Sequence, residues 1–422
     1  MTPALYSRRR ELGLLLTLAG IQFTHIVDFM IMMPLGPQLT RLFGISDAQF
    51  GLLVSAYTFA AGASSVLAAT YVDRFDRKKL LLLLYVLFAL ATLACGLAPS
   101  FGWLMVARVA AGAFGGVLSA LSQTIVGDVV PFERRGRAMA VVMSSFSAAT
   151  VAGVPLSLWL AAHLGWQAPF IAIALLSGLF ALGAHLTLPP LRHHLQSGAP
   201  AAFWHGIVRV LSDGNHRRAF GFSALLMFTG FTVIPYITIF MQTNVGVRTE
   251  QIPLIYLCGG VGSLVVARWV GRMSDRLGKA RTFQYMACAL IVPLFGVTLL
   301  PTLWPGPVVP IAAVLVVSSS MFIFMSGRMI PGMALLTSAA QPALRGTFMA
   351  LNASVQSAAM GLAALVGGLI ISRDAAGLVQ HYGWSAAVGA VASLASVWMA
   401  HRLTLHTSQS GPNRAAAQAK AP

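Results

Sequence analysis

Charged side chains are scarce in this sequence. Asp, Glu, Lys and Arg together make up 9% of the 422 residues, whereas about a quarter of an ordinary soluble domain is charged. Apolar residues account for 57% of the chain. So few charged groups cannot cover the surface of a soluble protein of this length. The composition therefore excludes an ordinary soluble protein and indicates a chain whose surface lies in lipid.

Cysteines and catalytic motifs are also largely missing. Cys95, Cys258 and Cys288 stand alone in apolar stretches, without the spacing of a disulfide scaffold or a metal site. The sequence contains no GxxxxGK[ST] phosphate loop and no HExxH motif, and no paired carboxylates. We therefore predict no cofactor, no metal and no enzymatic activity. An intramembrane enzyme stays a remote alternative, since the serines near His163 have no convergent Ser/His/Asp spacing.

Long uncharged runs take the place of charge. A bilayer core about 30 Å thick needs about 20 apolar helical residues per crossing. The runs that satisfy this are 48–72, 80–107, 109–127, 138–191, 219–247, 282–327, 346–372 and 375–401. Two of them are long enough for two crossings each, and 11–35 and 252–272 add two more. We expect about twelve helices; the first runs from about 11 to 36, and those of the second half lie at about 219–243, 252–273, 282–300, 308–330, 346–373 and 383–403.

Basic residues are distributed unequally between the two sides that these spans define. Of the 28 Lys and Arg residues, 22 fall in the tails and in every second loop. Only three lie in the alternate loops, namely Arg41, Arg248 and Arg373. The other three, Arg108, Arg268 and Arg328, lie inside spans. This positive-inside asymmetry predicts a multi-pass protein of a bacterial-type inner (plasma) membrane with both termini cytoplasmic. It also argues against nucleic acid as a partner.

A charged loop occurs twice. Asp73-Arg74-Phe75-Asp76-Arg77-Lys78-Lys79 lies between two apolar spans, and about 202 positions later the chain reads Asp275-Arg276-Leu277-Gly278-Lys279-Ala280-Arg281. The recurrence predicts two similar six-helix halves. We assign residues 1–190 and 219–403 to these bundles, 191–218 to a cytoplasmic linker with an amphipathic helix, and 404–422 to a disordered cytoplasmic tail.

The loops and the topology resemble the major facilitator superfamily. Its loop motif reads Gly-x-x-x-Asp-Arg-x-Gly-Arg/Lys-x-Arg/Lys. The second copy matches at Gly271, Asp275, Arg276, Gly278, Lys279 and Arg281. The first copy has Ala69 and Asp76 at the two glycine positions but keeps Asp73, Arg74, Arg77 and Lys79. The resemblance implies an all-α membrane protein with twelve transmembrane helices in two pseudo-symmetric six-helix bundles, which transports by alternating access.

Two further segments resemble subgroups of that superfamily. Arg108-Val-Ala-Ala-Gly112 resembles the Arg-x-x-x-Gly pattern of drug:proton antiporters, and Gly153-Val154-Pro155 is closer to the sugar-efflux (arabinose-efflux-like) permeases. The resemblance implies secondary active transport, with proton-coupled efflux of a small organic molecule or drug as the expected function. It also implies a conformational gate made of Asp73, Arg74, Arg77, Asp128, Asp275, Arg276, Gly278, Gly153 and Pro155.

Asp28 is the only acidic residue in the interior of a span. A carboxylate there faces a water-filled cavity or a partner. Gln22, His25 and Met32 follow the same side of the helix at three- and four-residue spacing, and Arg108 lies at a similar depth. A permanent structural ion pair is the plain alternative to a titrating one. The predicted proton and substrate site comprises Asp28, His25, Arg108, Gln22, Met32, Arg328, Tyr236 and Thr232.

Three intramembrane arginines against one aspartate support an alternative in the same fold. In it, Arg108 and Arg328 hold an organic anion or metabolite during uptake or facilitated diffusion. In either case we expect a monomer whose partners are a small-molecule substrate and the lipid bilayer, with the proton gradient as the coupling force in place of a cofactor.

Overall fold

A computed structural model describes residues 8–130, 132–191, 203–304, 309–341 and 344–406. Twelve helical spans in these residues are long and apolar enough to cross a membrane. The first part of the chain forms α1 (Arg8–Ile31), α2 (Gly36–Phe43), α3 (Asp47–Tyr71), α4 (Arg77–Gly96), α5 (Phe101–Val129), α6 (Phe132–Ala148), α7 (Val154–Leu164) and α8 (Ala168–Thr187). The second part forms α9 (Phe203–Ser212), α10 (Gly214–Phe231), α11 (Ile234–Thr243), α12 (Ile252–Leu277), α13 (Lys279–Ala289), α14 (Ile291–Leu303), α15 (Ile311–Ala339), α16 (Arg345–Ile370) and α17 (Tyr382–Ala400).

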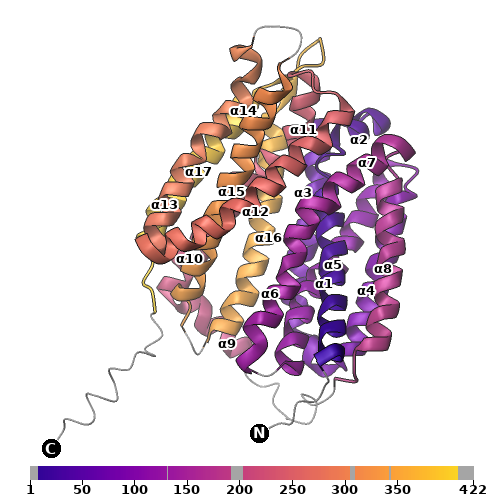
Figure 1. Ribbon diagram of the computed structural model, residues 1–422, viewed down its shortest axis with the longest axis vertical. Helices are drawn as coiled ribbons and strands as arrows, with labels where there is room; N and C mark the ends of the chain where they lie inside the picture. Colours follow the sequence, from indigo (N-terminus) through magenta and orange to yellow (C-terminus); the bar gives the residue numbers. More distant parts are fainter. Residues whose placement is uncertain (1–7, 131, 192–202, 305–308, 342–343, 407–422) are drawn as a thin grey trace, which may run out of the picture.

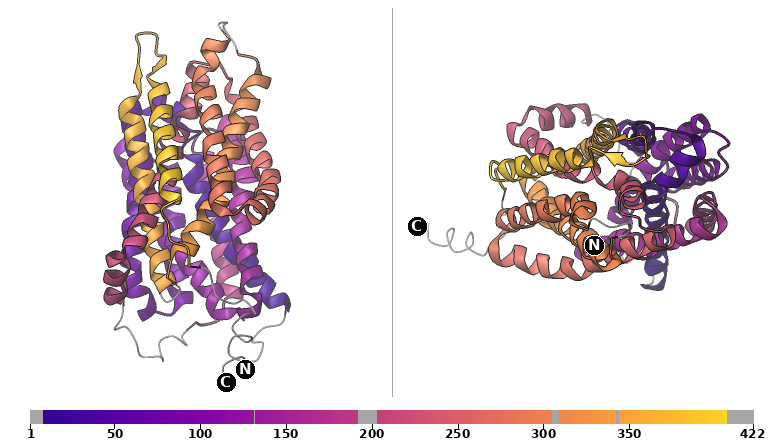
Figure 2. Two further views of the ribbon diagram at one scale, coloured as in Figure 1. Left: turned by 90° about the vertical axis from the view of Figure 1, so that its left-hand side faces the viewer. Right: turned by 90° about the horizontal axis from the view of Figure 1, so that it is seen from above.

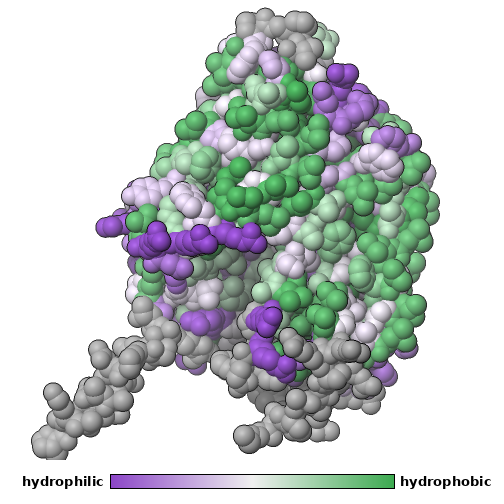
Figure 3. Space-filling view, viewed as in Figure 1, coloured by the Kyte–Doolittle hydropathy of each residue, from purple (hydrophilic) through white to green (hydrophobic). Residues whose placement is uncertain are grey.

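The helices form two bundles that lie side by side (Figure 1). α1 to α8 make up the first bundle and α10 to α17 the second. A short hairpin after α16 lies at one end of the molecule, and the start of α1 and the end of α17 lie at the other (Figure 2, left). We call these ends the hairpin face and the terminal face. On the side of the molecule that Figure 3 shows, hydrophobic residues cover most of the surface between them, as expected for a surface in contact with lipid tails.

The first helix of each bundle is broken near the hairpin face. The predicted helix 11–36 is in fact α1, which ends at Ile31, followed by a turn and α2. The predicted helix 219–243 is likewise split into α10 and α11. Pro37 and Pro235 stand in the first turn of α2 and α11, where a missing N–H and a fixed φ are tolerated. The prolines therefore begin new helices at both places.

The predicted helix 346–373 is too long at its end. α16 stops at Ile370, and Ser372–Arg373 (β1) pairs antiparallel with Val379–Gln380 (β2). The side chain of Asn244, just after α11, bonds β2 as a neighbouring strand would: its Oδ1 accepts from the Val379 N–H at 2.9 Å and its Nδ2 donates to the Val379 carbonyl at 2.9 Å. This hairpin is not evident from hydropathy, because its strands are only two residues long.

A π-helical turn joins α6 to α7. It spans Ala149–Gly153 (η2) and is followed by Pro155. Proline has no N–H to bond the carbonyl four residues earlier, and the wider turn accommodates that lost bond; such turns often occur at functional sites. The η2 turn also touches the second bundle, because a Cβ on Gly260 of α12 would lie 3.2 Å from the Thr150 carbonyl oxygen.

The two charged loops adopt different structures. In the first, Asp76 caps α4 by accepting from the Lys78 N–H at 3.0 Å, and Arg77 pairs with Asp128 of α5. Lys78 Nζ donates to the carbonyl of His185, in the last turn of α8, at 2.7 Å. It also donates to the carbonyl of Leu188, just after α8, at 2.5 Å. The first loop is thus bonded to two neighbouring helices of its own bundle.

In the second loop, α12 continues through Asp275 and Arg276, and Gly278 alone turns the chain into α13. Gly278 has a φ of 87°, which an L side chain rarely adopts. Asp275 and Arg276 are exposed, and Lys279 Nζ bonds the Ser338 hydroxyl at 2.8 Å. Although the two loops share a sequence pattern, only the first has a bonded arginine–aspartate pair among the described side chains.

The expected amphipathic linker helix is α9. Its Ile207 and Val210 are buried, and the helix lies against α10 and α16. The rest of the predicted linker from 192 to 202, and the predicted tail from 407 onward, lie outside the described residues.

Candidate functional site

Asp28 and Arg108 form a fully buried ion pair within the first bundle. Arg108 Nη1 of α5 donates to Asp28 Oδ2 at 3.0 Å and to the Asp28 backbone carbonyl at 3.3 Å. The hydroxyl of Thr92 on α4 donates to Asp28 Oδ1 at 3.2 Å. Asp28 and Arg108 are both 0% exposed. Three helices therefore hold one carboxylate, and the contact predicted from the depths of Asp28 and Arg108 is present.

Tyr57 of α3 covers the guanidinium group. The Arg108 Cζ lies 4.2 Å from the centre of the Tyr57 ring, a cation–π geometry that is strengthened by burial. Tyr57 in turn stacks on Phe29 of α1, with centroids 5.4 Å apart, and Phe29 stacks on Phe231 of α10 at 5.9 Å. Since α10 belongs to the second bundle, a short aromatic chain connects the ion pair to the contact between the bundles. Sequence reasoning missed Tyr57 and Thr92.

Glycines on α5 make this arrangement possible. A Cβ on Gly112 would lie 2.3 Å from the Tyr57 carbonyl oxygen, and a Cβ on Gly115 would lie 2.6 Å from His25 Cδ2. Both distances are too short for real side chains, so α5 can approach α1 and α3 this closely only with glycine at these positions. The glycine of the Arg-x-x-x-Gly pattern thus has a packing role next to the arginine.

His25 and Gln22 continue the polar face of α1 from Asp28 toward the terminal face. Gln22 Nε2 donates to the Ser119 hydroxyl of α5 at 3.0 Å. Both ring nitrogens of His25, together with Gln22 Oε1, the Tyr57 hydroxyl and Arg108 Nε, are buried without a hydrogen-bond partner among the described residues. Buried polar atoms usually have partners, so such a concentration in one place is unusual.

The remaining residues of the predicted site do not join this group. Arg328 of α15 is 1% exposed and donates from Nη2 to the Leu226 carbonyl of α10 at 2.8 Å, inside the second bundle. The Thr232 hydroxyl bonds the Thr229 carbonyl at 3.3 Å, and the Tyr236 hydroxyl bonds the Ala364 carbonyl of α16 at 2.5 Å. Met32 is buried in the hydrophobic core just after α1. Among the described contacts, no hydrogen bond joins these four residues to the Asp28–Arg108 pair.

The bundles are joined along α3 and α16. The Ser55 hydroxyl of α3 donates to the Gly361 carbonyl at 2.7 Å. A Cβ on Gly62 would lie 3.1 Å from Ser357 Cβ, and one on Gly51 would lie 2.8 Å from the Ala364 carbonyl oxygen. The two helix backbones are thus in close contact from the hairpin face to about the level of Gly62.

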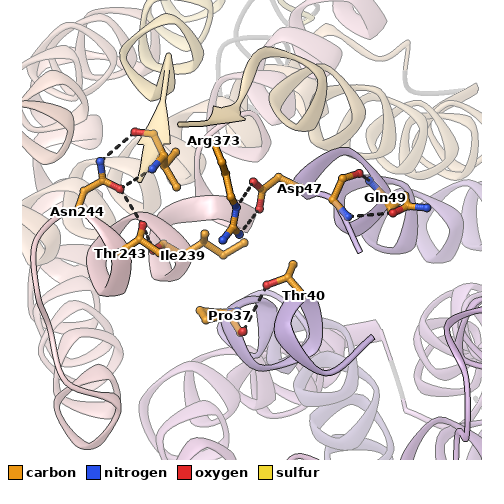
Figure 4. A network of polar contacts seen from close by, with 10 residues as sticks. Pro37, Thr40, Asp47, Gln49, Ile239, Thr243, Asn244 and Arg373 are labelled. Carbon is orange, nitrogen blue, oxygen red and sulfur yellow. Dashed lines mark hydrogen bonds and ion pairs between the residues drawn. The ribbon is translucent and has the colours of Figure 1, made fainter. Parts of the chain in front are cut away.

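A bidentate ion pair closes this seam at the hairpin face (Figure 4). Arg373 of β1 donates from Nε to Asp47 Oδ2 at 2.8 Å and from Nη2 to Asp47 Oδ1 at 2.7 Å. Asp47 begins α3 of the first bundle, so the pair connects the two bundles. Sequence reasoning missed it, although Arg373 is one of the few basic residues on its side of the membrane.

The predicted gate residues are distributed over the terminal face of the first bundle, the junction of η2 and α7, and the end of α12. Arg77 and Asp128 are paired, Arg74, Asp275 and Arg276 are exposed, and the side chain of Asp73 lies outside the described residues. Gly153 packs against α1, since a Cβ there would lie 2.4 Å from Val27 Cγ2. Gly153 therefore lies beside the residue that precedes Asp28.

Several ionisable groups outside the spans have shifted pKa values. The backbone N–H of His216 lowers the pKa of Asp213, which caps α10. The backbone N–H of Leu378 lowers the pKa of Asp374 in the hairpin. The carboxylate of Asp47 raises the pKa of Arg373, which keeps that guanidinium charged at the bundle contact.

The sequence profile of the Major Facilitator Superfamily matches residues 18–364. The chain belongs to this family. A relative from Streptomyces lividans is named chloramphenicol resistance protein. It is 28% identical to this chain over 332 residues, which cover 78% of this chain and 82% of the relative. An uncharacterized MFS-type transporter of Bacillus subtilis, YbcL, is 24% identical over 360 residues, 85% of this chain and 87% of its own.

Solved structures confirm the fold of this transporter. The crystal structure of a D-xylose-proton symporter matches with a TM-score of 0.74 at 18% identity, over 95% of this chain and 99% of the symporter. A bacterial homolog of the human lysosomal transporter Spinster matches with a TM-score of 0.72 at 16% identity, over 94% and 98% of the two chains. The protein is thus a multi-pass membrane transporter and not an enzyme, as the sequence predicted.

Proposed function

We propose that this transporter exports a small organic molecule or drug in exchange for protons, by alternating access of its two bundles. The terminal face would be cytoplasmic and the membrane a bacterial-type inner membrane. The observation that carries the proposal is the buried Asp28–Arg108 pair. Asp28 is the only acid in the interior of a span, and such residues commonly serve in proton relays.

The contacts of Asp28 suggest how a proton could act. When the carboxylate is ionised, it holds the Arg108 guanidinium by charge and by a 3.0 Å hydrogen bond. Protonation removes that attraction, and Arg108 keeps only the Asp28 backbone carbonyl and the Tyr57 ring. Tyr57 stacks on Phe29, and Phe29 stacks on Phe231 of the second bundle. A shift of Arg108 would therefore move Tyr57 and then Phe29, which contacts the second bundle.

The likeness to a chloramphenicol resistance protein supports efflux as the direction. In an exchanger, the substrate binds while Asp28 carries no proton and is therefore negative, so a neutral or cationic molecule suits the site. Because of the likeness to a chloramphenicol resistance protein, chloramphenicol is the first compound to test.

The experiment uses purified protein in liposomes with a pH-sensitive dye inside. We expect a substrate to drive proton movement with the wild-type protein, and Asp28→Asn to abolish it while substrate exchange without a gradient continues. Asn keeps an oxygen that can accept from Arg108 and Thr92, so the variant is expected to fold. Normal proton-coupled transport by Asp28→Asn would refute the role of Asp28.

A second candidate function is the transport of an organic anion, and Arg328 favours it. Nε and Nη1 of this buried arginine have no partner in the described parts of the chain. No acidic residue occurs in the interior of a span of the second bundle, since Glu250 and Asp275 lie at the two ends of theirs. An unpaired buried cation is unfavourable, and an anionic substrate would neutralise it. Proton-stimulated uptake of anions that is lost in Arg328→Gln would favour this function over efflux.

A further inference from the structure

The unpartnered polar atoms beside the ion pair point to a proton path, an inference that rests on the proposed proton-coupled function. His25 lies one helical turn from Asp28 on α1, on the side of the terminal face. Residues three apart on a helix are neighbours, with Cβ atoms about 5–6 Å apart. The groups that surround the His25 ring come from three other helices: Tyr57 from α3, Phe88 from α4 and Gly115 from α5.

The close approach of His25 and Tyr57 to Gly115 brings two of these polar atoms near each other. The point where a Gly115 Cβ would stand lies 2.9 Å from His25 Nε2 and 2.9 Å from the Tyr57 hydroxyl oxygen. These two atoms are therefore close enough for one water molecule to bond both. Each of them is buried and lacks a partner among the described residues, and buried waters typically satisfy such groups.

The polar face continues past His25. Gln22 is one turn closer to the terminal face, and its Oε1 is also buried and unpartnered. On α5, Ser119 bonds Gln22, and Ser122 is 0% exposed with an unpartnered hydroxyl in the described chain. Asp28, His25 and Gln22 thus follow one another at one-turn spacing on α1, and Ser119 and Ser122 do so on α5.

We propose that His25 relays protons between Asp28 and the terminal face, through a water molecule held by His25 Nε2 and the Tyr57 hydroxyl opposite Gly115. Because the proton of the proposed exchange leaves toward the terminal face, protonated Asp28 gives its proton to Nδ1 of the imidazole. The imidazolium gives its Nε2 proton to this water, which passes one to the waters beyond it along Gln22. The imidazole is then neutral again, Asp28 is a carboxylate, and a change of tautomer readies the imidazole for the next proton.

The charged and titratable groups that face His25 are consistent with a transient charge there. Asp28 is on the same helix, Arg108 and Tyr57 flank it from α5 and α3, and Tyr85 of α4 is bonded to Thr24 at 2.8 Å. Arg108 opposes a lasting positive charge on the imidazole. His25 therefore fits a carrier that is protonated only in passing, whereas Asp28 is where the proton stays.

His25→Phe and Gly115→Ala test the relay in the same liposome assay. His25→Phe removes the proton carrier. Gly115→Ala adds a methyl group that would lie 2.9 Å from His25 Nε2 and from the Tyr57 hydroxyl oxygen, so it displaces both groups from their present positions without changing their chemistry. Proton transfer by a positioned side chain typically contributes about 100-fold or more to a rate, so we expect His25→Phe to lower substrate-driven proton flux about 100-fold. Gly115→Ala should lower it less, and both should keep substrate exchange without a gradient.

Two substitutions serve as matched controls. His163→Phe replaces an exposed histidine at the end of α7, and Gly127→Ala changes a glycine of the same helix α5 that has no atom within 4 Å of its added Cβ. Both should behave as wild type. Thermal unfolding of each variant in detergent identifies any that fail to fold, and His25→Gln is the milder replacement should His25→Phe do so.

The outcomes separate this inference from the proposed function. If wild type moves no protons with substrate, the proposed function fails. If wild type is coupled, Asp28→Asn is uncoupled and His25→Phe and His25→Gln retain full proton flux, only the relay is refuted. Loss of exchange together with proton flux in a folded His25→Gln variant would indicate a structural role and would also overturn the relay.

Discussion

The ion pair between Asp47 and Arg373 should control which face of the transporter is closed. It is the bidentate contact that connects α3 of the first bundle to the hairpin of the second. Asp47→Asn removes the charge but leaves the helix start intact, because Ser46 caps α3 through the Gln49 N–H. We therefore expect the variant to fold and its hairpin face to open more often.

The expected size of the effect follows from the burial of the pair. The Arg373 side chain is 33% exposed and that of Asp47 only 5%. Exposed pairs contribute about 0.2–1 kcal/mol, and breaking a fully buried pair costs about 3–5 kcal/mol, so about 2 kcal/mol is a reasonable value for this intermediate case. Since about 1.4 kcal/mol is a tenfold change in an equilibrium constant, the ratio of closed to open hairpin face should fall about 30-fold.

Distances between spin labels would measure this shift. Labels at Leu42 of α2 and Leu378 of the hairpin, both exposed, report the separation of the two bundles at the hairpin face, once the three native cysteines are replaced. Asp47→Asn should increase the population with long distances, and the exchanged pair Asp47→Arg/Arg373→Asp should restore the short ones.

Asp374→Asn is the matched control. Asp374 is next to Arg373, but its carboxylate bonds only groups of the hairpin among the described contacts, namely the N–H groups of Ala376 and Leu378 and the amide of Gln380. Its loss should leave the distances between the bundles unchanged. If Asp47→Asn gives the same distances as the parent protein, or if the exchanged pair restores nothing, the ion pair does not hold this face closed.

Two stability predictions concern other parts of the structure. Gly112→Ala should lower the melting temperature, because its Cβ would lie 2.3 Å from the Tyr57 carbonyl oxygen and a backbone atom cannot rotate away. Gly127→Ala, on the same helix, is the control. Equal melting temperatures for the two variants would contradict this account of the α3–α5 contact. Asp213→Ala should lower the stability at pH 7 by about 1 kcal/mol, the usual value of a helix cap. Because the pKa of Asp213 is lowered in the folded protein, its contribution is present above the unfolded value of about 3.9 and is lost as the pH falls through the folded pKa. A stability difference between wild type and Asp213→Ala that is as large at pH 3 as at pH 7 would refute this assignment.

Much of the fold could be predicted from the sequence because the bilayer imposes simple constraints. Every span must be about 20 residues long and apolar, so hydropathy alone locates twelve spans. The repeated charged loop indicates two similar halves. A buried carboxylate needs a partner at the same depth, and counting residues along two helices was enough to bring Asp28 and Arg108 together.

Other features depend on how the helices are rotated and how closely they approach, which residue counting does not determine. Nothing in the spacing of α3 indicates that Tyr57 covers Arg108, and nothing in that of α5 indicates that Gly115 lies against the His25 ring. The same limit applies to Arg328, Thr232 and Tyr236, whose hydrogen-bond partners could not be read from the sequence. Depth along a helix can be read from sequence, but the direction in which a side chain faces is decided by its neighbours.

The sequence by itself therefore determined the class of protein, the number of spans, the duplicated loop and the one acid in the interior of a span. Only the tertiary structure decided which atoms surround that acid, that the two charged loops differ in their bonding, and that Asp47 meets Arg373 across the bundles. The physical reason is that hydropathy and charge act on each segment separately, whereas a contact between residues 326 positions apart exists only once both bundles are packed together.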